Sequence, residues 1–124
     1  MTKQIKFDLE DRLIDFSVLM IQIIEQVKKS KAGNLLTSQL IRSETSPALN
    51  YGEAQSGESH KDFIHKMKVS LKELRETRVC LKIIKRGKLT KNISLLNQIL
   101  NENNELIAIF VKSIQTASGN QRSQ

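Results

Sequence analysis

The sequence is poor in the residue types on which many functional sites depend. It has one cysteine, one proline, two histidines and no tryptophan, and aromatic residues make up 4% of its 124 positions. A single cysteine excludes an internal disulfide framework and any cysteine-rich zinc site. So few aromatic side chains disfavour the proteins that read single strands by stacking their bases. Together these counts disfavour most classes of enzyme.

Long apolar runs are also missing. The longest apolar cluster, residues 18–24, is interrupted by Gln22 and is far too short to span a bilayer. Charges occupy the N-terminal segment where a signal peptide has its apolar core. We therefore expect no membrane segment and no targeting signal. With the free thiol, this predicts a reducing, cytoplasmic location.

Acidic residues are too few to balance the basic ones. Lys and Arg number 20 against 13 Asp and Glu, which gives a net charge of +7. The apolar fraction of 39% is sufficient for a core, and a chain of this length forms one domain without help from a metal or a disulfide. The composition predicts a single basic globular domain.

Apolar residues recur at helical spacing in four segments, and none shows the alternation of a strand. The first segment runs from about residue 8 to 30, and Gly33 and Asn34 then stop it. The second runs from about residue 35 to 55. Pro47 inside it should kink the helix or start a second half-helix, with Thr45 or Ser46 as the cap.

The third segment runs from Ser59, its expected N-cap, to residue 86. The fourth starts near Thr90 or Asn92 and runs to about residue 117. Four helices of this length with short connections pack most simply as an all-α, up-down-up-down four-helix bundle. We expect this bundle to span residues 8–117. Residues 1–7 should form a flexible N-terminus and residues 118–124 a disordered tail.

Nearly all of the surplus positive charge lies in and just after the third helix. Residues 60–91 contain eleven Lys and Arg against three acids, a net charge of +8, so the other residues sum to −1. Five of these cations project within about 60° of one another on a helical wheel. A stripe of this kind suits a phosphate backbone; the alternative is a solvated face that keeps the protein soluble. The predicted nucleic-acid-binding residues are Lys61, Lys68, Lys72, Arg75 and Arg86.

The third helix also carries apolar residues away from its core stripe. A helix that is apolar on two sides usually has a second neighbour, which predicts a homo-oligomer; scattered surface aliphatics are the alternative. The predicted interface residues are Val69, Cys80, Ile83 and Ile84.

Two cations, Arg78 and Lys85, fall close to the core-facing sector of the same helix. A buried cation needs a partner, for which Glu53 and Glu105 are candidates. Reaching to the rim of the bundle is the alternative, because long side chains can extend to water.

Residues with catalytic potential have simpler explanations. Ser59, His60 and Asp62 are adjacent at a helix start, where capping explains them. His60 and His65 are badly spaced to share a metal, and Cys80 has no histidine near it in sequence. A carboxylate site in the bundle remains possible, but no Glu-x-x-His pair supports a di-iron centre. We predict no catalytic residue, no metal and no cofactor.

Several short motifs between residues 36 and 84 belong together. Residues 36–40 (LTSQL) resemble the opening of a second helix, and residues 46–54 (SPALNYGEA) resemble a Pro-containing Asn-x-x-Glu motif. Ser59 with Asp62 begins the third helix, and residues 70–74 (SLKEL) match a Ser-Leu-x-Glu-Leu motif. In these motifs the chain resembles the bacterial four-helix-bundle family encoded in intervening sequences of 23S ribosomal RNA genes. It departs where the family often has Ile-Ala-Glu-Gly and this chain has YGEA.

The resemblance implies more than a fold. The family is similar to the accessory variability protein of diversity-generating retroelements, a basic barrel of five identical bundles that binds nucleic acid and a reverse transcriptase. The resemblance therefore implies a ring-like homopentamer, with RNA or DNA as a ligand and a reverse transcriptase as a partner. It implies no enzymatic activity, because none is established for the family. The leading hypothesis is non-enzymatic nucleic-acid binding through the third helix. The alternative is a protein–protein adaptor for which nucleic acid is incidental.

Overall fold

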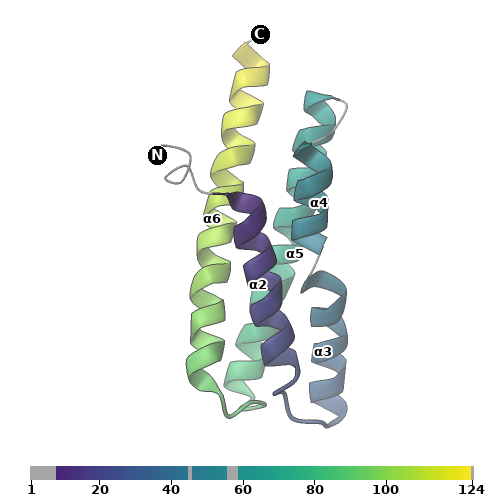
Figure 1. The fold of residues 1–124 in the computed structure, drawn as a ribbon, viewed down its shortest axis with the longest axis vertical. Coiled ribbons are helices and arrows are strands. Elements are labelled where there is room, and N and C mark those ends of the chain that lie inside the picture. The colour runs from purple at the N-terminus through teal and green to yellow at the C-terminus, as the bar shows by residue number, and fades with distance from the viewer. Residues whose placement is uncertain (1–7, 45, 56–58, 124) are drawn as a thin grey trace.

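The computed structural model describes residues 8–44, 46–55 and 59–123, and every regular element among them is a helix. In chain order these are α2 (Leu9–Ile24), α3 (Lys31–Glu44), α4 (Ser46–Gln55), α5 (His60–Arg86) and α6 (Ile93–Ser123). Figure 1 shows α2 and α5 running in one direction and α3, α4 and α6 in the other. With α3 and α4 in place of the second predicted helix, the all-α packing of four helices is confirmed. The predicted flexible N-terminus lies outside the described residues.

Two predicted helix starts are confirmed. The Ser59 hydroxyl accepts a hydrogen bond of 3.0 Å from the backbone N–H of Asp62, which satisfies one of the free donors at the start of α5. Pro47 is the second residue of α4, where its missing N–H removes no helical hydrogen bond. It therefore begins a new helix; the alternative cap, Thr45, lies outside the described residues.

The first predicted helix is too long. α2 ends at Ile24, and α3 already begins at Lys31, so Gly33 is inside a helix and does not stop one. Val27 made the helical pattern of apolar residues appear to continue beyond Ile24. It is buried, although it lies in the connection between α2 and α3. The connection folds across the end of the bundle, where the Lys28 N–H donates to the carbonyl oxygen of Leu89 at 2.6 Å.

The last helix begins at the second of its two predicted starts and ends later than predicted. The side chain of Asn92 caps α6 by accepting from the N–H of Leu95 at 3.1 Å. α6 continues to Ser123, past the predicted end at residue 117, so it covers most of the segment expected as a disordered tail.

The core lies between α5 and its three neighbours, α3, α4 and α6, and between α2 and the same three helices. α2 and α5 lie diagonally opposite each other across the core. Phe16, Met20 and Phe110 are among the largest buried side chains. No helix in the described part of the chain is long and apolar enough to cross a membrane.

Candidate nucleic-acid interface

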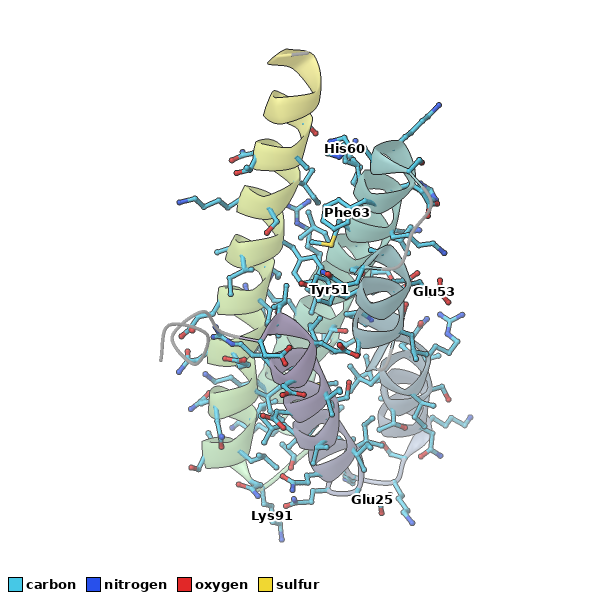
Figure 2. The ribbon with its side chains drawn as sticks, turned by 45° about the horizontal axis from the view of Figure 1, so that its top comes forward. Glu25, Tyr51, Glu53, His60, Phe63 and Lys91 are labelled. Carbon is cyan, nitrogen blue, oxygen red and sulfur yellow. The ribbon has the colours of Figure 1, made fainter. Side chains whose placement is uncertain are left out.

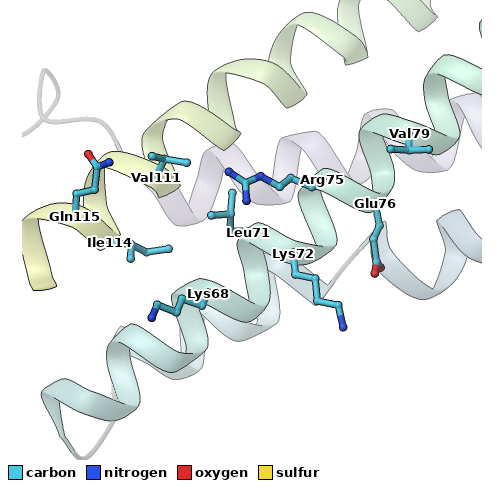
Figure 3. A pocket seen from close by; sticks show the side chains of 9 residues that line it. All are labelled: Lys68, Leu71, Lys72, Arg75, Glu76, Val79, Val111, Ile114 and Gln115. Carbon is cyan, nitrogen blue, oxygen red and sulfur yellow. The ribbon is translucent and has the colours of Figure 1, made fainter.

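The five cations of the predicted stripe are all exposed on α5. Lys61 lies in its first turn and Arg86 is its last residue, so the stripe follows the whole helix. The buried residues of α5 face its neighbours on the opposite side. The structure therefore places all five positive charges at the surface, and Lys68, Lys72 and Arg75 lie on consecutive turns (Figure 3).

Ion pairs with acidic neighbours do not neutralise this stripe, although the charge of Lys72 acts on Glu73 next to it on α5. Within the described residues, the ion pair on α5 joins Lys66 to Glu53 at 2.6 Å, and none of the five stripe cations forms one. The hydrogen bond to Glu53 raises the pKa of Lys66. The stripe thus keeps its charge available for an anionic ligand.

The partners predicted for Arg78 and Lys85 are used elsewhere. Glu53 pairs with Lys66, and Glu105 accepts a hydrogen bond of 2.5 Å from Arg12. Arg12 also holds Glu102 through two hydrogen bonds of 2.6 and 2.9 Å. Arg78 is half-buried and Lys85 is exposed, so the cation that needed acidic partners was Arg12, which the sequence analysis overlooked.

A groove of about 600 Å³ lies between α5 and α6, beside the stripe. Figure 3 shows Arg75 extending toward α6 near Val111, whereas Lys72 and Glu76 extend from α5 to another side. Polar groups rim the groove and aliphatic side chains form its floor: Leu71, Val79, Val111 and Ile114. The sequence did not indicate Val79, which is 55% exposed, because a single valine between Arg78 and Cys80 adds to no helical pattern.

The predicted oligomer interface is only partly at the surface. Ile83 is 47% exposed, and Val69 and Cys80 are half-buried, but Ile84 is fully buried in the core. Assigning Ile84 to the interface was wrong. α5 packs against three helices and not one, so its buried arc is wider than the stripe read from the sequence. Burial, and then the negative charge of Glu76, raise the pKa of the Cys80 thiol.

The histidine at the start of α5 has a structural role. His60 donates from Nε2 to the carbonyl oxygen of Ala117 at 2.9 Å and stacks on Phe63, with 6.5 Å between ring centroids. Figure 2 shows both rings between the upper parts of α5 and α6. These contacts fix the start of α5 against α6. The described residues contain no group of three His, Cys, Asp or Glu arranged to hold a metal ion.

Comparison with known proteins assigns the family. The family model for the 23S rRNA-intervening sequence protein matches residues 6–112. The chain belongs to this family. A similar solved structure is the crystal structure of a protein of unknown function from the S23 ribosomal protein family of Bacteroides thetaiotaomicron. It has 26% sequence identity and a TM-score of 0.75 and covers 86% of this chain and 98% of its own.

No curated protein matches this chain. Membership of the 23S rRNA-intervening sequence family confirms the resemblance seen in the sequence and agrees with the observed packing of helices. Because the solved relative is itself of unknown function, the family assigns a fold but not an activity. The function must be argued from the exposed surfaces of this chain.

Proposed function

We propose that this 23S rRNA-intervening sequence family protein is a non-enzymatic nucleic-acid-binding protein whose α5 contacts the phosphate backbone of RNA or DNA. The observation that carries the proposal is the row of exposed, unpaired cations along α5: Lys61, Lys68, Lys72, Arg75 and Arg86. Such contacts recognise charge and not base sequence, so binding should tolerate many sequences.

Removing two stripe charges tests the proposal. The double variant Lys68→Gln/Lys72→Gln should bind a fluorescein-labelled oligouridylate at least about tenfold more weakly. Without these two lysines, binding releases fewer counterions from the nucleic acid. The slope of log affinity against log salt should fall by about 1.4, because each phosphate contact on a single strand contributes about 0.7. Fluorescence anisotropy between about 50 and 200 mM salt measures both quantities, and the wild type should lose at least about tenfold in affinity over this range.

The matched control is Arg42→Gln/Lys112→Gln, which removes two exposed charges from α3 and α6. It should change affinity much less than the α5 variant. Equal losses in the two variants would mean that net charge and not this face attracts the nucleic acid. A salt-independent affinity would exclude the phosphate-contact mechanism altogether.

The apolar floor of the groove supports a second candidate function, a protein–protein adaptor. Val79 and its aliphatic neighbours between two helices, rimmed by cations, suit the apolar face of an acidic amphipathic helix. The resemblance makes a reverse transcriptase the partner to test first. In this case charge would steer association and nucleic acid would be incidental.

The substitution Val79→Asn separates the two functions because it leaves the charge unchanged. A protein that remains bound to the wild type after nuclease treatment, but not to Val79→Asn, supports the adaptor. Nucleic-acid binding through phosphate contacts should be unaffected by this variant.

A further inference from the structure

The end of the bundle that carries the α2–α3 and α5–α6 connections is strongly basic. These connections lie at the same end (Figure 1), and Glu25 and Lys91 both lie at that end in Figure 2. Residues 25–31 and 85–92, which we call the loop end, contain seven exposed Lys and Arg and one acid, Glu25. None of the seven forms an ion pair with any residue that the structure describes. They are Lys28, Lys29, Lys31, Lys85, Arg86, Lys88 and Lys91.

The two connections form one surface. The backbone hydrogen bond from Lys28 to Leu89 is 2.6 Å long, and the amide of Asn92 donates to the side chain of Gln26 at 2.9 Å. Between them lies a groove of about 570 Å³, lined by Lys28, Lys88 and Lys91 together with polar and apolar groups of the same connections. Lys28 thus lines the same groove as Lys88 and Lys91, which lie about sixty positions later in the sequence.

Lys88 occupies a backbone conformation that favours glycine. Its φ is 56°, in the left-handed region. The residue ends α5 in a Schellman motif, in which Leu89 donates to Ile84 at 3.0 Å and Lys88 donates to Lys85 at 3.2 Å. The neighbouring Gly87 has φ −80°, so the available glycine is not used at the position that needs it.

A lysine in this position costs free energy that a glycine would not. Strain of this kind, where it is observed, points to a functional constraint. At Lys88 it coincides with a groove that two further lysines line, and lysine ammonium groups bind phosphate as point charges.

We propose that the loop end binds a phosphate group of a nucleic-acid backbone, held by Lys28, Lys88 and Lys91. The assignment of the phosphate to a nucleic acid rests on the function proposed above, whereas the phosphate site itself does not. The site lies where α5 ends at Arg86, so it extends the row of cations on α5 around the end of the bundle.

The first test uses inorganic phosphate and the full chain. In an NMR titration at constant ionic strength, phosphate should cause saturable shifts concentrated at the amides of residues 88–91, and chloride should not. The variant Lys28→Gln/Lys91→Gln should lose saturation, whereas the control Arg42→Gln/Lys112→Gln should keep it. Linear shifts in the wild type, or an equal loss in the control, would overturn the site.

Lys88→Gly separates binding from folding. Because glycine relieves the left-handed strain, this variant should melt roughly 3–5 °C higher than the wild type and yet bind phosphate at least severalfold more weakly. Unchanged phosphate binding in this more stable variant would show that the Lys88 side chain is not part of the site.

The labelled oligouridylate then tests the source of the phosphate. Lys28→Gln/Lys91→Gln should reduce the salt slope of its binding by about 1.4, because two phosphate contacts with a single strand are lost. If phosphate binds saturably but this slope is unchanged, the nucleic-acid assignment is wrong. If the oligouridylate does not bind the wild type while inorganic phosphate still does, the proposed function fails and the phosphate site stands.

Discussion

At the scale of the residue, neighbouring side chains on one helix have opposite roles. Ile83 and Ile84 follow each other on α5, but Ile83 is 47% exposed and Ile84 is fully buried. Successive residues of a helix point about 100° apart, so one step separates the surface from the core. Lys82 and Lys85, which flank this pair, are both exposed.

Truncating the two isoleucines should therefore have very different effects. Ile84→Ala should lower the free energy of unfolding by about 2–5 kcal/mol, because it leaves a cavity in a packed core. Ile83→Ala should cost less than about 1 kcal/mol, as expected for a surface position. Urea unfolding followed by circular dichroism measures both, and similar losses would mean that α5 is rotated relative to the arrangement described here.

At the scale of the element, close approach decides where helices begin and end. A Cβ atom built on Gly33 would lie 1.9 Å from the carbonyl oxygen of Lys28. Only a glycine lets the first turn of α3 pass so close to the preceding connection. That contact helps to hold the connection across the end of the bundle, where Lys28 bonds to Leu89.

Adding a methyl group at this position should disturb both elements. Gly33→Ala should destabilise the protein by about 1–3 kcal/mol, since the backbone oxygen cannot move away without displacing the connection. The control is Gly119→Ala on α6, where a Cβ meets nothing within 4 Å. This change should stabilise by about 0.5–1 kcal/mol through helix propensity. Thermal unfolding of both variants checks the difference in sign.

At the scale of the whole molecule, charge and apolar surface are distributed over different faces. The cations gather on α5 and at the loop end. On the diagonal helix, α2, three apolar residues at spacings of four and three form an exposed stripe, each 46–47% exposed: Ile14, Val18 and Ile21. An exposed helical stripe of this kind is typical of a contact between subunits.

We expect the protein to self-associate through such exposed apolar surface. Multi-angle light scattering at micromolar concentration should give a mass several times the 14.1 kDa of one chain. Val18→Ser/Ile21→Ser should reduce this mass if α2 forms the contact, and Ile83→Ser should do so if α5 forms it as the sequence predicted. A mass of 14.1 kDa for the wild type would rule out a homo-oligomer under these conditions. Charge removal at Lys68 and Lys72 should leave the mass unchanged.

Much of the bundle was predictable because the interactions that set its helix starts and its exposed faces are local. Ser59 caps α5 through a hydrogen bond to a residue three positions away. Pro47 divides the second predicted helix into α3 and α4, because its ring is incompatible with a helix interior. The exposed row from Lys61 to Arg86 followed from helical periodicity alone.

What the sequence by itself determined is thus the helical content, the family motifs and the excess of cations on one helix, since each arises from residues within a few turns of one another. Only the tertiary structure decided that Ile84 is core, that Arg12 holds Glu102, and that Lys28 meets Lys88 and Lys91 at one groove. These outcomes depend on how separate helices and connections pack, and residues sixty positions apart leave no periodic trace of that packing in the sequence.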